Sequence, residues 1–244
     1  MDAVAPFASF GNTTGTLSAD DRDSGDSKAY DITGGTADTA LVGYTVSKAG
    51  TYGTLYLNGS TGAYVYVPTD SAIEGLKANT SETFTVSVTD GSTASASQTL
   101  TINLTGANDT PVLTAPTAIT YTDTSADNTF SNTTGTLSAT DRDSGDTKTY
   151  GITDGTADTS LVGYTVSKAG TYGTLYVNST SGAYEFEVDA AAVNGRLTDA
   201  SESFTLKVTD SLGATDTKSF TVNVTAANDT PALTASVTST TLVD

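Results

Sequence analysis

Apolar and polar residues alternate with a period of two along several short stretches of the chain. In 83–89, Phe84, Val86 and Val88 are separated by threonine and serine, and 98–105 follows the same rule. Successive side chains of a β-strand point to opposite faces, so each stretch presents one apolar face. A short loop joins the two stretches, which predicts an antiparallel pair of half-buried strands.

Other stretches rich in Thr, Val and Tyr extend this pattern over the whole chain. The turn residues at 59–62, Gly-Ser-Thr-Gly, indicate a hairpin between two of the predicted strands. Only two segments, 69–76 and 189–197, look helical, for about two turns each. The remaining strands are predicted at 14–19, 28–33, 42–47, 53–58 and 63–67. Many short strands separated by Gly, Asn, Asp and Ser are typical of a β-sandwich.

The chain contains one long internal repeat. Residues 10–114 align without a gap on 130–234, an offset of 120 positions, and the block LVGYTVSKAGTYGTLY is identical in both copies. A unit of this length is a whole domain rather than a solenoid repeat. We therefore predict two tandem Ig-like or cadherin-like β-sandwich domains in line, over 1–114 and 115–234, with 235–244 as the start of a third repeat.

The composition narrows the chemistry that the chain can perform. It has 28 Asp and Glu against 10 Lys and Arg, giving a formal net charge of -18, and it has neither Cys nor His. A surface this acidic repels nucleic acid and anionic membranes, and it attracts divalent cations. The absence of Cys and His excludes disulfides, thiolate or imidazole metal sites, and a Ser-His-Asp triad.

An acidic motif occurs at the same place in each repeat. The sequence Asp-Arg-Asp-Ser-Gly-Asp stands at 21–26 and again at 141–146, and Asn-Asp-Thr-Pro ends each repeat at 108–111 and 228–231. Carboxylate and amide oxygens are the ligands that Ca²⁺ prefers. An EF-hand is excluded, because the twelfth position counted from Asp141 is Ile152 rather than Glu.

Strand direction sorts the carboxylates between the two ends of each domain. A strand of 7–8 residues spans roughly 20 Å, so Asp90, which follows the stretch 83–89, lies far from Asn108 and Asp109. Glu82 begins the same stretch and lies at the end of Asn108 and Asp109. By the same argument, Asp210 lies at the opposite end of its domain from Glu202, Asn228 and Asp229.

The motifs together resemble those of bacterial VCBS and cadherin-like repeats, which form long arrays in large secreted adhesins exported by type I systems. The resemblance rests on the Asp-x-Asp after the second strand, on Val-Thr-Asp at the end of the penultimate strand, and on Asn-Asp-x-Pro at the exit. The resemblance covers nearly the whole chain, because both repeats carry these motifs. It implies calcium ions at the domain junctions and a secreted or cell-surface location.

The resemblance also places Asp141 and Asp143 at the junction. Together with the positions inferred from strand direction, this gives three predicted groups of ligands. The alternative is that these residues only cap turns, as Asp and Asn commonly do. The central group is Glu82, Asn108, Asp109, Asp141, Asp143 and Asp210; a half-site for an upstream domain is Asp21, Asp23 and Asp90; and the far end carries Glu202, Asn228 and Asp229.

The resulting hypothesis is a calcium-rigidified extender module of a bacterial adhesin that supports cell adhesion or biofilm formation. Its partners are adjacent repeats of the same chain, without nucleic acid or membrane insertion, and we expect a monomer. One alternative is a carbohydrate-binding module that uses a tyrosine platform, although cross-strand packing is the commoner role of such residues. The second alternative, an enzyme, is disfavoured by the residue inventory, since Glu185 and Glu187 share one strand face without an obvious partner. The candidate platform consists of Tyr44, Tyr52, Tyr56, Tyr64 and Tyr66.

Overall fold

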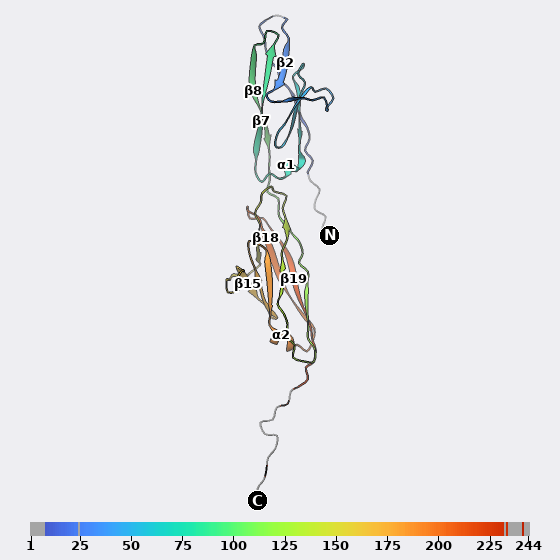
Figure 1. Cartoon of the computed structure of the whole chain (residues 1–244), viewed down its shortest axis with the longest axis vertical. Helices are drawn as coiled ribbons and strands as arrows, with labels where there is room; N and C mark the ends of the chain where they lie inside the picture. Colours follow the sequence, from blue (N-terminus) through green and yellow to red (C-terminus); the bar gives the residue numbers. More distant parts are fainter. Residues whose placement is uncertain (1–7, 24, 232, 234–240, 242–244) are drawn as a thin grey trace. The chain divides into compact units, whose positions relative to one another are not determined.

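The computed structural model describes residues 8–23, 25–231, 233 and 241. Contacts within the chain divide it into two compact units, Met1–Asp109 with Arg142–Gly145, and Thr110–Asp141 with Asp146–Asp244. The all-β prediction is confirmed, because each unit is built from β-sheets with one short helix (Figure 1). Of the predicted third repeat, 235–244, only Thr241 belongs to the described residues.

The first unit contains two sheets. A five-stranded sheet has the order β1-β6-β5-β4-β3, and a three-stranded sheet has the order β2-β7-β8. All its strand pairs are antiparallel. The elements are β1 (Thr13–Thr16), β2 (Lys28–Ile32), β3 (Thr36–Ala37), β4 (Val46–Ala49), β5 (Gly53–Leu57), β6 (Ala63–Pro68), α1 (Asp70–Glu74), β7 (Thr80–Asp90) and β8 (Ser95–Leu104).

The second unit repeats this plan and adds strands to it. Its sheets have the orders β11-β17-β16-β15-β14, β10-β19-β18-β13 and β12-β9. The pair β10–β19 is parallel, and the others are antiparallel. The elements are β9 (Val112–Leu113), β10 (Ile119–Thr122), β11 (Thr133–Thr136), β12 (Ala139–Thr140), β13 (Thr149–Ile152), β14 (Thr156–Ala157), β15 (Val166–Ala169), β16 (Gly173–Val177), β17 (Ala183–Val188), α2 (Ala190–Asn194), β18 (Ala200–Thr209) and β19 (Thr215–Thr225).

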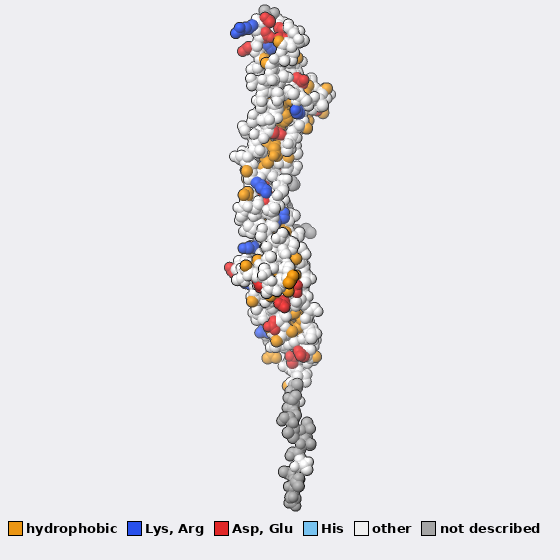
Figure 2. All heavy atoms as spheres, turned by 60° about the vertical axis from the view of Figure 1, so that its left-hand side comes forward, with side chains coloured by type: hydrophobic (Ala, Val, Ile, Leu, Met, Phe, Trp, Pro, Cys, Tyr) orange, Lys and Arg blue, Asp and Glu red, His pale blue; other side chains and the backbone are white. Residues whose placement is uncertain are grey.

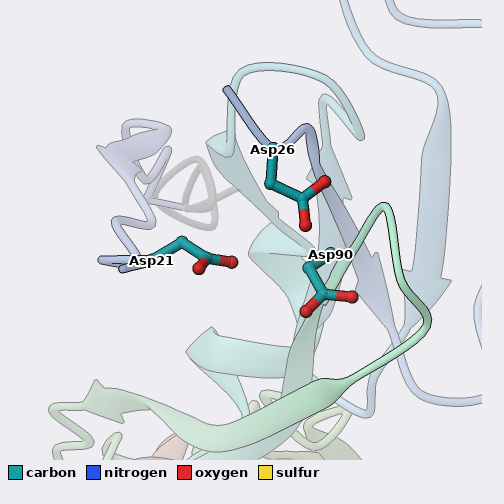
Figure 3. A group of neighbouring side chains, drawn as sticks. All are labelled: Asp21, Asp26 and Asp90. Carbon is teal, nitrogen blue, oxygen red and sulfur yellow. The ribbon is translucent and has the colours of Figure 1, made fainter. Parts of the chain in front are cut away.

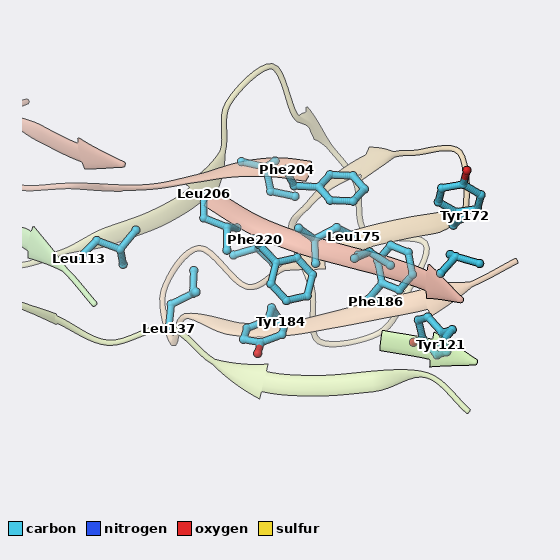
Figure 4. Close-up of a cluster of buried hydrophobic side chains, with 14 of the residues drawn as sticks. Leu113, Tyr121, Leu137, Tyr172, Leu175, Tyr184, Phe186, Phe204, Leu206 and Phe220 are labelled. Atoms are coloured by element: carbon cyan, nitrogen blue, oxygen red, sulfur yellow. The ribbon is translucent and has the colours of Figure 1, made fainter. Parts of the chain in front are cut away.

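The period-two stretches form the long central hairpins, as predicted. Phe84 and Val86 of β7 are buried. The buried residues of β18 and β19 are Phe204, Leu206, Val208, Phe220, Val222 and Val224. Register pairs Phe84 with Leu100 and Phe204 with Phe220, so apolar residues of neighbouring strands share one face. The core of the second unit lies between its sheets (Figure 4).

Local chemistry explains the predicted hairpin. The Asn58 side-chain oxygen accepts hydrogen bonds from the N–H groups of Ser60 and Thr61, at 2.9 and 3.0 Å. Gly62 has φ of +72°, in the left-handed region that glycine adopts without strain. The turn therefore closes between β5 and β6 where the sequence predicts it.

Two predictions about elements need correction. The strand predicted at 42–47 begins only at Val46, because Val42 is 93% exposed in a turn that Gly43 makes with φ of +92°. The helices are single short turns that end before Gly75 and Gly195, shorter than predicted. The strands β9 and β10 occupy a region in which the alternation predicted none.

Candidate metal centre

The first acidic cluster joins the loop after β1 to the end of β7. Asp21, Asp26 and Asp90 each offer a carboxylate oxygen, and these oxygens lie within 4.8 Å of one another. Figure 3 shows the Asp26 and Asp90 carboxylates side by side, with the Asp21 side chain directed toward them from across the loop. The N–H of Gly91 donates to Asp26 Oδ1 at 2.9 Å, which holds the loop against the β7–β8 turn.

The second cluster lies within one loop. Asp141, Asp143 and Asp146 again bring carboxylate oxygens within 4.8 Å of one another. Asp143 is 4% exposed, and its Oδ2 accepts the N–H of Asp109 at 2.8 Å. The neighbouring Arg142 donates to Glu74 Oε1 at 3.0 Å in a half-buried ion pair. The hydrogen bond from Asp109 thus holds the loop at its buried carboxylate, and the ion pair with Glu74 holds it at the preceding residue.

The two clusters use different members of the same motif. In the first repeat Asp23 is exposed and its N–H donates to Asp21, whereas its counterpart Asp143 is buried within the second cluster. Asp90 joins the first cluster, whereas its buried counterpart Asp210 is outside the second among the residues that the structure describes. Asp210 Oδ1 accepts the N–H groups that follow it in the β18–β19 turn.

The two glutamates predicted as ligands have carboxylates that hold a turn. Glu82 accepts the N–H of Thr51 at 2.8 Å and of Tyr52 at 3.3 Å, and it also accepts the hydroxyl of Tyr66. Glu202 accepts the corresponding N–H groups of Thr171 and Tyr172. A Cβ at Gly50 would meet the Glu82 carboxylate, so a side chain at this position would displace the glutamate from the turn.

The Glu82 contact also affects the tyrosine that it binds. Burial and the neighbouring carboxylate both disfavour the ionised phenol, so the pKa of Tyr66 lies well above its ordinary value. Tyr66 therefore keeps its hydroxyl proton throughout the physiological pH range and donates a hydrogen bond to Glu82. The Glu82 carboxylate therefore stabilises the fold of the first unit.

The remaining predicted ligands lie at the exits of the repeats. Asn108 and Asp109 are half-buried, and the Asn108 side-chain amide donates to the Asp109 carbonyl at 3.0 Å. Asn228 and Asp229 are exposed. The register of β7 and β8 places Asp90 and Asp109 at opposite ends of the first unit, in agreement with the argument from strand direction. The three groups of ligands defined in the sequence analysis remain predictions.

The sequence analysis missed Asp26 and Asp146 as cluster members. Both end the six-residue motif that it singled out, five positions after Asp21 and Asp141. The Gly before each aspartate has positive φ, +88° at Gly25 and +68° at Gly145, so the loop turns back and returns the last carboxylate toward the first. The glycine at the fifth position was the available signal.

Three carboxylates at this distance suit a hard cation. Two unit charges 4 Å apart repel by about 1 kcal/mol even at the dielectric constant of water, and by more when half-buried. Three carboxylates supply up to six oxygens, and Ca²⁺ takes six to eight, with water and backbone carbonyls completing the set. The donor set contains no nitrogen or sulfur, so it fits Ca²⁺ better than zinc or copper.

The tyrosines of the proposed sugar platform pack against their neighbours. None of the five is fully exposed; Tyr66 is buried, and Tyr44 meets Tyr56 edge to face with ring centroids 6.4 Å apart. The face drawn in Figure 2 consists largely of backbone and uncharged polar side chains, with charged groups scattered among them. In the described part of the chain, no helix has the length and hydropathy needed to cross a membrane.

No family model and no curated protein matches the sequence. Solved structures of cadherin ectodomains are similar to it at low identity: mouse cadherin-23 EC22-24 (16% identity, TM-score 0.38, 87% of this chain and 58% of that one), human CDH23 EC21-23 (18%, 0.39, 87% and 66%) and Drosophila N-cadherin EC1-4 (17%, 0.31, 88% and 45%). This chain thus spans less than two thirds of each. At these scores the likeness assigns no residue a role, and the fold rests on the strand pairing described above.

Proposed function

We propose that this chain is a pair of calcium-binding structural repeats from an extracellular adhesive protein, in which the repeats act as spacers. The observation that carries the proposal is the recurrence of the same acidic motif in both repeats, gathered each time into three close carboxylates. A bacterial cell-surface adhesin exported by a type I system is the source that the sequence resemblance supports. Adhesion and biofilm formation belong to that part of the proposal.

The physical role of the ion follows from the charges. Without a cation, three carboxylates repel one another and favour open loops. A bound Ca²⁺ turns this repulsion into a crosslink between the loop and the elements beside it. At a free calcium concentration tenfold above the dissociation constant, each site adds about 1.4 kcal/mol to the stability of the folded state. Extracellular modules bind with constants of roughly 0.1–1 mM.

Calorimetric titration and thermal unfolding test the binding step. We expect heat of calcium binding and a higher Tm in millimolar calcium than in chelator. Asp26→Asn and Asp146→Asn should each weaken one site, since ligand charge tunes calcium affinity. Asp20→Asn is the matched control, because it removes an exposed carboxylate next to the first cluster but outside it. Equal Tm with and without calcium, or equal losses in all three variants, would refute the calcium sites.

Scattering tests the spacer role separately. If calcium stiffens the two-repeat chain, small-angle scattering in chelator should give a broader distribution of interatomic distances than scattering in calcium. Asp146→Asn in calcium should resemble the wild type in chelator. Calcium binding without any change in scattering would leave the ion sites intact and remove the spacer role.

A further inference from the structure

The loop that carries the second cluster is anchored by residues far from it in the sequence. Arg142 Nη1 donates to Glu74 Oε1 at 3.0 Å, and the two side chains are only 22% and 12% exposed. The N–H of Ser144 donates to the Gly75 carbonyl at 3.1 Å. By its contacts the segment Arg142–Gly145 belongs to the first unit. The end of helix α1 thus holds this segment at two residues.

Asp143 lies between these two anchored residues. It is 4% exposed, and its Oδ2 accepts the N–H of Asp109 at 2.8 Å. A carboxylate that is held in this way has its position before a cation arrives, so little conformational freedom is lost when the cation binds. Asp143 is therefore the best-positioned member of the cluster that it forms with Asp141 and Asp146.

Arg142 is a positive charge inside an acidic motif, and it can act on a cation in two opposite ways. Its charge alone repels a cation at the neighbouring carboxylates. Its ion pair with Glu74 instead fixes the segment that carries Asp143. The pair is largely buried, and removal of one partner from such a pair leaves the other charge uncompensated, so the segment would rearrange. The geometry favours the second effect.

We propose that Glu74 is a positioning residue of the second cluster, which holds the segment around Asp143, through Arg142, in the arrangement that binds Ca²⁺. This role rests on the calcium binding proposed above and adds a form of regulation to it. The calcium affinity of the second cluster then depends on the folding of the first unit. Because coupling is reciprocal, a cation at this cluster also stabilises the contacts of α1 with the segment.

Calorimetric titration with calcium in an Asp26→Asn background, in which the first cluster is weakened, tests this role. Glu74→Gln should raise the dissociation constant of the second cluster roughly tenfold, because residues that orient metal ligands contribute at least this much to affinity. Arg142→Met separates the two effects of Arg142. Positioning predicts weaker binding by a similar factor, whereas the loss of a positive charge alone predicts tighter binding. Arg142→Lys keeps the charge and an ion pair, and it should bind nearly as tightly as the background chain.

Asp154→Asn is the matched control. It removes the carboxylate of another ion pair, with Lys168 at 3.9 Å, and it lies outside both clusters. It should leave the dissociation constant unchanged. Thermal unfolding in calcium and in chelator gives a second readout: a merely structural role of Glu74 lowers Tm equally in both, whereas positioning reduces the rise in Tm that calcium causes.

Hydrogen exchange measures the reciprocal effect. Calcium should slow the exchange of the N–H groups of Asp109 and Ser144 in the background chain, and Glu74→Gln should lose most of this protection. Exchange at these two groups that does not respond to calcium would contradict the coupling between α1 and the cluster.

The remaining outcomes separate this role from calcium binding itself. An unchanged dissociation constant in Glu74→Gln, tighter binding in Arg142→Met, or an equal loss in Asp154→Asn would overturn the positioning role and leave the calcium sites in place. A wild-type chain that binds no calcium would refute the proposed function, and the positioning role with it. Glu74→Gln and Arg142→Met break the pair from opposite sides, so if circular dichroism shows that one is unfolded, the other still decides.

Discussion

The two units have closely similar sequences but bury their central strands to different depths. Phe220 and Val222 of β19 are fully buried, whereas their counterparts Leu100 and Ile102 of β8 are only partly buried. The block LVGYTVSKAGTYGTLY is identical in both and forms the same strands. The difference arises because β9 and β10 cover the second unit. The alternating pattern therefore decides which face is apolar, and the preceding segment decides how far it is buried.

Two features away from that edge are shared by both units. The Glu82 and Glu202 carboxylates hold equivalent turns, and the Ser47 and Ser167 hydroxyls donate to Asp38 and Asp158 at 2.7 and 2.6 Å. The units thus differ at the edge that β9 and β10 cover and in their acidic loops. Variants at matched positions can measure the first of these differences.

Tyr121→Ala should have the largest effect and should make the second unit resemble the first. Removing the ring uncovers Phe130 and Phe186, and we expect a loss of about 3–5 kcal/mol in the free energy of unfolding of the second unit. Phe10→Ala, at the counterpart of Phe130 in the first unit, should cost under about 1 kcal/mol, because Phe10 is already exposed. Hydrogen exchange read separately on β7 and β18 measures both. Similar losses in the two variants would show that β10 does not cause the difference.

Glu202→Gln and Glu82→Gln should have intermediate effects, somewhat larger at Glu82, which also accepts the hydroxyl of Tyr66 where the second unit has Phe186. Each removes the charge from a carboxylate that accepts two backbone N–H groups, which should cost about 1–2 kcal/mol in its own unit. Denaturant unfolding with exchange resolved by repeat gives the two values. A larger loss in Glu202→Gln than in Glu82→Gln would contradict this account.

The smallest effect should be a pH dependence shared by both units. The hydroxyl of Ser47 holds the pKa of Asp38 below its ordinary value, and Ser167 does the same for Asp158. A carboxyl with a lowered folded pKa stabilises the fold above its unfolded pKa, and this stabilisation disappears as the pH falls through the folded value. Asp38→Asn and Asp158→Asn should each lower Tm slightly at neutral pH and leave it unchanged in strong acid. Thermal unfolding of the wild type and the two variants from neutral pH to strong acid tests this prediction. A lower Tm of either variant that persists in strong acid would contradict it.

The sequence allowed much of the strand framework to be predicted, because the relevant signals are local. The alternation around Phe84 and the turn after Asn58 depend on neighbouring residues, and both were confirmed. Strand β10 gives a weak signal of its own, since only Ile119 and Tyr121 alternate and its partner β19 lies far along the chain. Val42 was misread because apolar character alone does not reveal the turn at Gly43.

The candidate site was predictable as a motif but not as a set of ligands. The sequence indicates where carboxylates gather, yet Asp23 is exposed while its counterpart Asp143 is buried beside Asp109. Identical motifs thus differ because a backbone N–H from another segment reaches only one of them. Glu82 shows the same limit, since the turn that occupies its carboxylate lies more than 30 residues away in the sequence.

The parallel pairing of β10 with β19 determines how late during synthesis the sheet of the second unit can be completed. The Asn223 side chain donates to the Ile119 carbonyl across 104 residues, so β10 has no partner until β19, the last strand of the unit, has been made. A ribosome that adds about 5–20 residues per second needs roughly 5–20 s to bridge this interval. During that time β18 lacks its hairpin partner, and Ile119 and Tyr121 have no strand to pair with. The sheet β10-β19-β18-β13 can form completely only after β19 has left the exit tunnel of the ribosome.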